Sequence, residues 1–459
     1  MKKQVIAIFD IGKTNKKIIL FDKNLDIVLQ KEEEFPAVTD EDGYECDDIE
    51  LIEGWLKFSL QDLLNGGEYD VVAVNYSTYG ASLVFLDENG KRLAPVYNYL
   101  KPIPEEFAGA LYQKYGGKEE FCRKTASPAL GLMLNSGVQI LWLKNEREEI
   151  FRQTKNILHF PQYLSFLLTN KIASEPTSIG CHTFMWDFDN MKYHQWLEDE
   201  AIKLPQPLPN STLVKVSIGK ANIYSGIGIH DSSASLVPYL RGSNEEFVLV
   251  STGTWCISMN PFNHTPLTSD ELKQDCLSYL SINQEPVKSS RLFMGHIHDV
   301  NTAQLEKAFN VPGGSYKKVV TNENLIAGYL NGEVGGAVFF KNGIPPDYLD
   351  NEVDLARFSG FQEAYHRLMY DLTLQCAKSL NLVLKRNDSI KKLFVSGGFA
   401  RNEIFVRLLA SLFPGKKVYT SEIDNASALG AALVVWEAMD KKDFPAIGLG
   451  LTEWKAFVL

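Results

Sequence analysis

The sequence predicts an α/β protein with two large domains, and three observations support this prediction. With 459 residues, the chain is too long for one compact hydrophobic core. Short strands rich in β-branched residues alternate with amphipathic helices. A strand-turn-strand pattern opens the chain and returns at residues 247–260. We therefore expect an N-terminal domain at residues 1–241 and a C-terminal domain at residues 242–459, with the boundary in the polar turn at 241–244.

The N-terminal domain begins with a predicted meander of three strands, at residues 5–10, 17–22 and 27–34. Only short turns connect these strands, so the opening differs from the strand-helix-strand unit of a dinucleotide-binding fold. A helix is expected at residues 48–64, because five apolar residues recur there at helical spacing. These residues are Ile49, Ile52, Leu56, Leu60 and Leu63.

The rest of the first domain should contain a buried strand at residues 71–75, a hairpin and a helical region. The hairpin is expected around the turn DENG at 87–90, with arms at 84–86 and 91–95. Residues 104–204 are predicted to be mostly helical and contain several aromatic residues, so they should form an insertion or cap on the first sheet.

In the second domain, a long amphipathic helix is expected at residues 361–384. A short buried strand at 393–395 precedes a helix that begins at about residue 402. A strand at 417–419 then precedes a helix of small residues at 426–437. The two strand-turn-strand patterns are only weakly similar in sequence, but they indicate that the two halves are related.

The composition excludes several classes of protein. The formal net charge is −11, which argues against nucleic acid or an anionic membrane as the main partner, because both need clustered cations. No apolar run approaches the about 20 residues that span a bilayer. The six cysteines are scattered without CxxC spacing, which favours reduced thiols in a cytoplasmic protein over disulfides or a zinc site. The sequence leaves open whether the chain forms a homodimer.

The turn after the first strand carries groups that can hold phosphate. Gly12 permits a tight turn and lets the backbone approach a ligand closely. The turn amides and the side chains of Thr14 and Asn15 can bond phosphate oxygens, and Lys13 and Lys17 would add positive charge.

Asp10 stands at the end of the same strand, where it could hold Mg²⁺ through water. The alternative is a plain hairpin turn that the Asp10 carboxylate caps. Considered alone, the short pattern DxGxT favours this simpler interpretation.

Two further turns have the same character. Gly253 and Thr254 lie between the strands of the second pattern, where they could grip a transferring phosphate or form an ordinary threonine-rich turn. Gly397 and Gly398 follow a strand and precede a helix, so a flat ring or a ribose could lie against their backbone. Asn402 would be the N-cap of that helix, a role that is compatible with ligand binding.

His230 and Asp231 precede a predicted helix that begins SSASLV. Asp231 could be the helix cap. It could instead be a general base that accepts a proton from a substrate hydroxyl, with His230 bound to a neighbouring hydroxyl.

Other known site patterns are absent from the sequence. There is no GxxxxGK[ST] phosphate loop, no GxGxxG after a strand and no GxSxG nucleophile elbow. The run HIHD at 296–299 could suggest a metal, but no further set of ligands accompanies it, so histidines that are solvated or line a ligand are favoured.

Taken in order, these motifs resemble the FGGY carbohydrate kinases of the actin-like ATPase superfamily. The matching strings are FDIGKTN, NYSTYGASLVFLDENGKRL, GIHDSSAS, STGTWCISMNP, SGGFARN and NASALGAAL. The resemblance spans almost the whole chain, and the order and spacing of the strings make it specific. It is closest to the rhamnulokinase and fuculokinase branch, through the HD-containing and SGTW-like strings.

This resemblance implies two ribonuclease-H-like domains, with ATP and a sugar meeting in the cleft between them. Asp231 would be the catalytic base, and Asp10 would organise Mg²⁺ through water. The residues implied around the ATP phosphates and the adenosine are Gly12, Lys13, Thr14, Asn15, Lys17, Gly253, Thr254, Gly397, Gly398 and Asn402. The residues implied around the sugar are Thr78, Tyr79, Gly80, Asn98, His230 and Asp231.

The chain departs from the branch in two places. Rhamnulokinase-like chains usually have Tyr-Arg-Asp after the second hairpin, whereas this chain has YNY at 97–99. They also place an asparagine ahead of a Met-Gly step, whereas here RLF at 291–293 precedes that step and the histidines of 296–299 follow it. The resemblance therefore supports kinase chemistry but does not identify the sugar, its reacting hydroxyl or any regulation.

The hypothesis that follows is an ATP-dependent sugar kinase that phosphorylates a hydroxyl of a ketose or deoxyketose similar to L-rhamnulose or L-fuculose. Such a transfer needs alignment and charge stabilisation more than covalent chemistry. One alternative is a catalytically silent kinase-like regulator that binds sugar or ATP, suggested by the altered sugar-site residues. Another is a nucleotide-driven chaperone or filament protein, for which the chain lacks an obvious extra domain.

Overall fold

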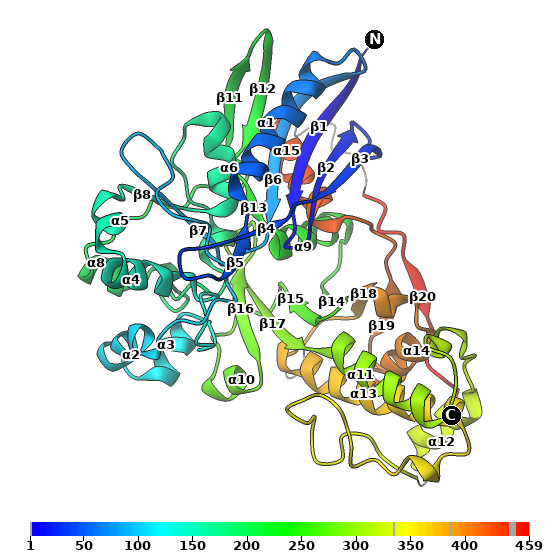
Figure 1. Cartoon of the computed structure of the whole chain (residues 1–459). Coiled ribbons are helices and arrows are strands. Elements are labelled where there is room, and N and C mark those ends of the chain that lie inside the picture. The colour runs from blue at the N-terminus through cyan, green and yellow to red at the C-terminus, as the bar shows by residue number, and fades with distance from the viewer. Residues whose placement is uncertain (1, 334–335, 386–387, 440–446, 459) are drawn as a thin grey trace.

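The computed structural model describes residues 2–333, 336–385, 388–439 and 447–458. Within these ranges the chain forms two large β-sheets, and helices cover both (Figure 1). The α/β architecture predicted from the sequence is therefore confirmed. None of the helices in the described part of the chain combines the length and the apolar character that a bilayer-spanning helix needs.

The first sheet has the spatial order β11-β12-β6-β1-β2-β3, and β13 pairs with β6 beyond this path. Its strands are β1 (Lys3–Ile11), β2 (Asn15–Asp22), β3 (Ile27–Glu34), β6 (Tyr69–Thr78), β11 (Leu213–Ile218), β12 (Ala221–Gly226) and β13 (Ile229–His230). β1 to β3 form the predicted antiparallel meander, whereas β6 runs parallel to β1.

The register of the first sheet brings three strand ends together. Ile11 of β1 is paired with Thr78 of β6, and Thr78 is also paired with His230 of β13. Because these strands are parallel, their carboxyl ends meet at one edge of the sheet. Asp10 and Asp231 lie next to this row in the chain, so the fold gathers them at the same edge.

The two faces of the first sheet are covered by segments from opposite ends of the chain. α1 (Ile49–Asn65) buries the five apolar residues predicted for its inner face, and Asp48 caps it. Side chains alternate along β1, so Val5 and Phe9 join the α1 core while Ile6 and Ile8 face the opposite side. On that side lie α9 (Asp231–Gly242) and α15 (Ala426–Met439), which pack against each other.

The predicted helical region sits beside the first sheet (Figure 1). Its helices are α2 (Glu105–Lys114), α3 (Lys118–Lys124), α4 (Ser136–Glu146), α5 (Glu148–Gln153), α6 (Phe160–Thr169), α7 (Pro176–Ile179) and α8 (Gln195–Asp199). Three short strand pairs accompany them: β4 (Ala37–Thr39) with β5 (Glu45–Asp47), β7 (Leu83–Leu86) with β8 (Asn156–His159), and β9 (Trp186–Asp187) with β10 (Lys192–Tyr193).

The hairpin predicted around residues 87–90 is only half correct. The turn forms, because the amide of Gly90 donates to the carbonyl of Asp87. The predicted second arm is not a strand and makes only an isolated bridge from Arg92 to Leu86. β7 is buried along its whole length and pairs with β8 instead, a partner about 70 residues away that local turn chemistry does not reveal.

The second sheet has the spatial order β16-β17-β15-β14-β18-β19-β20. Its strands are β14 (Phe247–Thr252), β15 (Cys256–Asn260), β16 (Cys276–Leu280), β17 (Pro286–Leu292), β18 (Lys392–Gly397), β19 (Lys417–Thr420) and β20 (Thr452–Trp454). β14 repeats the pairing of β1, since it is antiparallel to the next strand and parallel to β18.

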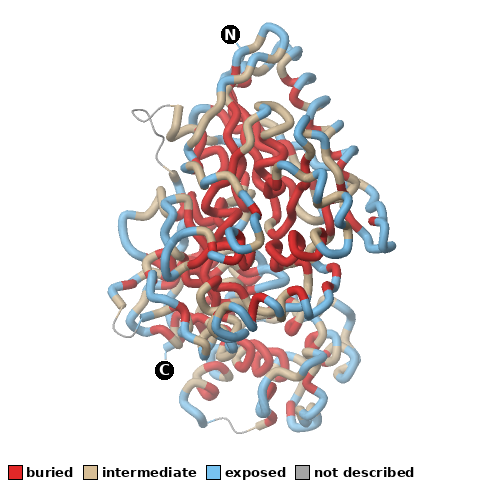
Figure 2. Tube along the Cα trace, turned by 90° about the vertical axis from the view of Figure 1, so that its left-hand side faces the viewer, coloured by how far each residue is buried: buried red, intermediate tan, exposed pale blue. Residues whose placement is uncertain are grey.

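Helices of the second half cover this sheet. They are α10 (Ser269–Lys273), α11 (Met294–Ala308), α12 (Glu323–Asn331), α13 (Phe361–Val383) and α14 (Glu403–Leu412), with the 3₁₀ helices η1 (Ser315–Lys318), η2 (Leu355–Arg357) and η3 (Gly398–Arg401). α13 buries Ala364, Leu368 and Leu372, which recur at helical spacing on one face, and this confirms the predicted amphipathic helix. Figure 2 shows buried chain through the middle of the molecule. All six cysteines are buried and form no disulfide.

Candidate active site

Asp10 stands at the shared strand edge and contacts elements from distant parts of the sequence. Its Oδ2 accepts a hydrogen bond of 3.0 Å from the hydroxyl of Ser427 on α15. Burial, followed by the nearby carboxylate of Asp231, raises the pKa of Asp10 from 3.8 to about 6. Asp10 and Asp231 therefore lie close enough for their charges to interact.

The turn from residue 12 to residue 15 has the tight form expected of it, because the amide of Gly12 donates to the carbonyl of Asn15 over 2.9 Å. Thr14 is exposed. Of the two predicted cationic side chains, Lys13 pairs with a carboxylate, its Nζ lying 2.7 Å from Asp47 Oδ2, whereas the charge of Lys17 acts on Asp10 and partly offsets the rise that burial causes in the pKa of that carboxyl. Lys17 Nζ is 3.4 Å from Asn425 Oδ1.

Asp47 connects three side chains near the site by hydrogen bonds, a role that was not predicted from the sequence. Its carboxylate accepts hydrogen bonds from Lys13, Lys16 and the hydroxyl of Tyr79, at 2.7 to 2.8 Å. Burial alone would raise the pKa of Asp47, but these three donors outweigh burial and lower it. The strand predicted at 17–22 in fact begins at Asn15, which buries Lys16, and a buried lysine requires a carboxylate nearby.

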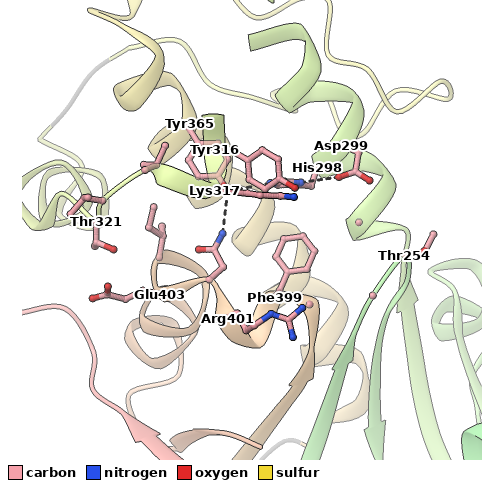
Figure 3. A pocket seen from close by; sticks show the side chains of 17 residues that line it. Thr254, His298, Asp299, Tyr316, Lys317, Thr321, Tyr365, Phe399, Arg401 and Glu403 are labelled. Atoms are coloured by element: carbon pink, nitrogen blue, oxygen red, sulfur yellow. Dashed lines mark hydrogen bonds and ion pairs between the residues drawn. The ribbon is translucent and has the colours of Figure 1, made fainter. Parts of the chain in front are cut away.

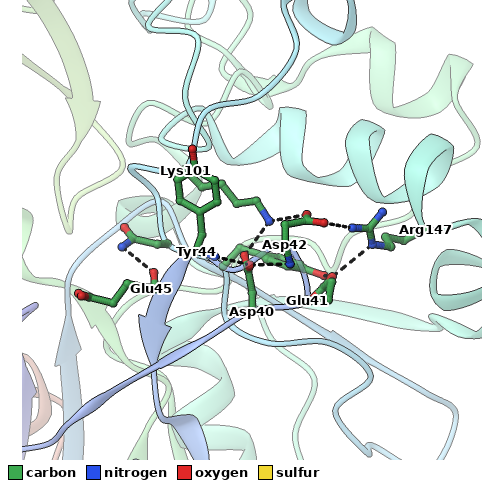
Figure 4. Close-up of polar contacts among 9 residues, drawn as sticks. Asp40, Glu41, Asp42, Tyr44, Glu45, Lys101 and Arg147 are labelled. Atoms are coloured by element: carbon green, nitrogen blue, oxygen red, sulfur yellow. Dashed lines mark hydrogen bonds and ion pairs between the residues drawn. The ribbon is translucent and has the colours of Figure 1, made fainter.

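The β4–β5 pair that carries Asp47 is held to the helical region by ion pairs (Figure 4). Lys101 Nζ lies 2.6 Å from Asp40 and 2.7 Å from Asp42, and Arg147 also pairs with Asp42. The Lys101 ammonium is 4.9 Å from the centre of the Trp142 ring. This network fixes β5, and therefore Asp47, relative to the segment at 97–101.

Three side chains predicted to face a sugar are bound within the protein. Thr78 Oγ1 donates to the carbonyl of Tyr79, and the Tyr79 hydroxyl donates to Asp47. Asn98 Nδ2 donates to the carbonyl of Glu45 over 2.9 Å. The neighbouring Tyr99 ring is half-buried and stands 5.9 Å from the Tyr79 ring.

Asp231 is the first residue of α9, and His230 occupies the cap position. The interpretation of Asp231 as the helix cap is therefore wrong. The short strand β13 ends at His230, and α9 begins directly after it, at Asp231 itself. The Asp231 carboxylate is 35% exposed. Burial, followed by the charge of Asp231, raises the pKa of Tyr99, so this tyrosine also lies near that carboxylate.

A cavity of about 880 Å³ opens on the second sheet (Figure 3). The turn residues Gly253 and Thr254 line it, together with the start of α11, η1, η3 and the start of α14. Gly398 and Asn402 also belong to its lining, as expected from the sequence. Its size suits a ligand as large as a nucleotide.

Side chains in this cavity are held by hydrogen bonds and aromatic contacts. Asn402 caps α14 through the amide of Phe405, which confirms the predicted cap, and its Nδ2 donates to the hydroxyl of Tyr365. His298 Nε2 also lies 3.2 Å from that hydroxyl, and its ring meets Phe399 edge to face. These aromatic residues give the cavity flat walls that a ring could stack on.

Two glycines permit the close backbone approaches around the cavity. Gly397 has a φ of 84°, and a side chain there would collide with the backbone of Thr252. At Gly295, on the first turn of α11, a Cβ atom would lie 2.9 Å from the Cα of Thr254. The helix start and the Gly253–Thr254 turn therefore touch.

The predicted ligand-binding residues thus fall into two groups. One lies on the first sheet around Asp10, Asp231 and the turn at 12–15, and the other lines the cavity on the second sheet. Among the described residues, no group of three or more His, Cys, Asp or Glu side chains is placed to hold a metal ion. Mg²⁺ usually keeps several waters and takes one or two protein carboxylates with substrate phosphates, and Asp10 with Asp231 nearby fits that requirement.

Comparison with known families gives two matches. The model of the FGGY family of carbohydrate kinases, N-terminal domain, matches residues 5–222. The model of the carbohydrate kinase FGGY, C-terminal domain, matches residues 244–319 and 355–443. Together the two models span most of the chain.

Similar proteins include a rhamnulokinase from Halalkalibacterium halodurans, which is 23% identical over 94% of this chain and 92% of its own length. A gluconokinase from Bacillus subtilis is 22% identical over 95% of this chain and 87% of its own length. Among solved structures, a carbohydrate kinase from Novosphingobium aromaticivorans superposes with a TM-score of 0.81 at 22% identity, covering 100% of this chain and 95% of that one. This structural similarity confirms the expected two-domain fold.

Proposed function

Because the chain belongs to the FGGY family of carbohydrate kinases, we propose that it transfers the γ-phosphoryl group of ATP to a hydroxyl of a ketose or deoxyketose similar to L-rhamnulose or L-fuculose. The chain is accordingly a phosphotransferase with an alcohol group as acceptor. The single observation that carries the proposal is that the carboxylates of Asp231 and Asp10 lie at the same strand edge, close enough for their charges to interact. The rhamnulokinase among its relatives supports the choice of sugar.

ATP would occupy the cavity on the second sheet. The flat walls formed by Phe399 and Tyr316 suit a nucleobase, and the Gly253–Thr254 turn would meet the phosphates. Gly398, which lines the cavity, and the adjacent Gly397 would leave the backbone bare beside the ribose. When bound, Mg²⁺ would neutralise the phosphate charge, with Asp10 holding it through water.

Asp231 would serve as the base. It starts a helix, is partly exposed and faces the same edge as Asp10, so its carboxylate is available to a hydroxyl that approaches from solvent. The acceptor oxygen attacks the γ-phosphorus as its proton passes to Asp231. Phosphoryl transfer depends mainly on alignment and charge stabilisation, so proton removal late in the step is sufficient.

The acceptor would lie against Gly80, which abuts the His230 ring, and Tyr99, which lies near Asp231. Lys13 belongs to the turn at 12–15 that would meet the phosphates. Its Nζ is also 6.0 Å from the centre of the Tyr99 ring, and its side chain is 30% exposed, so it would lie near the acceptor as well. The Asp47 carboxylate would keep Lys13 and Tyr79 in place.

The test is a coupled ATPase screen over L-rhamnulose, L-fuculose, both enantiomers of xylulose and ribulose, glycerol and gluconate. Asp231→Asn should lower kcat by at least about a thousandfold while the Kd for ATP changes less than about threefold. Asp70→Asn, an exposed aspartate at the other end of β6, is the matched control. Turnover by Asp231→Asn at the wild-type rate would exclude it as the base, and binding without turnover across the panel would favour a silent regulator.

A further inference from the structure

The two oxygens of the Asp231 carboxylate have different surroundings. Oδ1 accepts from the amide of Ser232 over 2.5 Å and from its hydroxyl over 3.2 Å. The same oxygen lies 3.2 Å from Nε2 of His230. Among the residues that the structure describes, Oδ2 has no hydrogen-bond partner. Oδ1 is therefore held by Ser232 and His230, and Oδ2 is available to bind a ligand.

His230 has little surface to offer a sugar. Its side chain is only 6% exposed. At Gly80, a Cβ atom would lie 2.8 Å from His230 Nε2 and 2.9 Å from Cδ2, so this glycine covers the edge of the ring that also meets Asp231. The backbone amide of His230 donates to Thr177 Oγ1, which fixes the residue from the other side.

The second ring nitrogen, Nδ1, is buried and has no hydrogen-bond partner among the described residues. The thiol of Cys181 lies beside the ring. An ionised carboxylate can only accept a hydrogen bond, so the contact with Asp231 places the proton of a neutral ring on Nε2; if the ring is charged, both nitrogens carry protons. In both states Nε2–H points at Asp231.

The groups around His230 favour the protonated, positively charged form of its ring. Burial alone would lower its pKa, but Cys181, Asp231 and Glu175 outweigh burial and raise the pKa to about 9. His159 also faces the ring.

We propose that His230 is a positioning residue for the catalytic base rather than a sugar ligand. Its Nε2–H holds Oδ1 of Asp231 and thereby presents Oδ2 to the acceptor hydroxyl. This inference rests on the proposed kinase function.

The proposal assigns the proton to one atom. The acceptor oxygen forms a bond to the γ-phosphorus, the bond from that phosphorus to the β–γ bridging oxygen breaks, and ADP leaves with the bonding electrons. The hydroxyl proton passes to Oδ2 of Asp231 and later to solvent. His230 keeps its own proton throughout, so it neither gains nor loses charge in the step.

Three substitutions of His230 test the proposal. Glutamine can place an N–H where Nε2 stands, so His230→Gln should keep kcat within about threefold of wild type. His230→Leu and His230→Asn lack a donor that reaches Asp231, so each should lower kcat roughly 10- to 100-fold with the sugar KM changed less than about threefold. His264→Leu, at an exposed histidine, is the control. A raised KM at unchanged kcat, or equal losses in the Gln and Leu variants, would overturn the proposal.

A measurement without turnover separates this proposal from the kinase function. In protein labelled with ¹⁵N-histidine, long-range ¹H–¹⁵N correlation reports which ring nitrogens are protonated, and the His230 signal is the one lost in His230→Gln. We expect a protonated Nε2 at pH 7, and a lower His230 pKa in Asp231→Asn. An unprotonated Nε2 at pH 7 would refute the positioning role even if the sugar screen is positive. An empty sugar screen with Nε2 protonated would instead count against the kinase function alone.

Discussion

Asp10 and Asp231, 221 positions apart in the chain, meet at one edge of the first sheet, and the charge of Asp231 contributes to raising the pKa of Asp10 to about 6. Two carboxylates whose charges interact repel each other unless one of them is protonated or a cation lies between them. The free protein therefore stores an unfavourable interaction that Mg²⁺ with nucleotide phosphates would relieve.

This relationship predicts how stability depends on pH. Between the unfolded pKa of 3.8 and the folded value of about 6, the folded protein holds a proton on Asp10 that the unfolded chain has released. The free energy of unfolding contributed by Asp10 therefore falls as pH rises from about 4 to about 6, by at most roughly 3 kcal/mol. Urea unfolding of wild type and Asp10→Asn across this range measures the difference.

In Asp231→Asn the same contribution should shrink but not vanish, because burial is the larger cause of the shift. Equal pH slopes in wild type and Asp10→Asn would contradict the raised pKa.

A second prediction concerns Asp47. Its removal would leave Lys16, which is 2% exposed, without the carboxylate that neutralises it. Asp47→Asn should therefore lower the free energy of unfolding at pH 7 by about 3 kcal/mol. The pKa of Asp47 is lowered in the folded state, so the stability it supplies is complete above the unfolded pKa of 3.8 and is lost as pH falls further.

Chemical denaturation at pH 7 checks this effect, and the double variant Lys16→Met with Asp47→Asn should recover part of the loss. Asp70→Asn again supplies an exposed control. A loss below about 1 kcal/mol would mean that water reaches the Lys16 ammonium.

A third prediction compares two adjacent glycines, Gly397 and Gly398, the second of which lines the cavity on the second sheet. Gly397 has a φ of 84° and faces the backbone of Thr252, whereas a Cβ atom on Gly398 would meet nothing within 4 Å. Gly397→Ala should lower the free energy of unfolding by about 1 to 3 kcal/mol, and Gly398→Ala should change it by less than about 1 kcal/mol.

Thermal unfolding with ATP absent measures both variants, so that nucleotide contacts do not enter the comparison. Equal Tm values for Gly397→Ala and wild type would show that the strand end can shift to accept the methyl group.

Much of the local structure could be predicted from the sequence. The α1 stripe, the meander of β1 to β3 and the cap at Asn402 were all predicted correctly, because each depends on the spacing of apolar residues or on side chains within one turn. The ordered motifs also identified the family, since their matches extend over both domains. The domain boundary and the roles assigned to the site residues stay predictions.

Local sequence patterns were sufficient to predict most of the helices and strands, the apolar faces they bury and a helix that starts close to Asp231. Long-range contacts, by contrast, became visible only in the folded chain: Lys13 pairs with Asp47, β7 pairs with β8, and α15 packs on the first sheet. The physical reason is the distance along the chain over which each interaction acts. The side-chain periodicity of a helix or a strand depends on residues a few positions apart. The partner of a buried charge depends instead on how distant segments pack together.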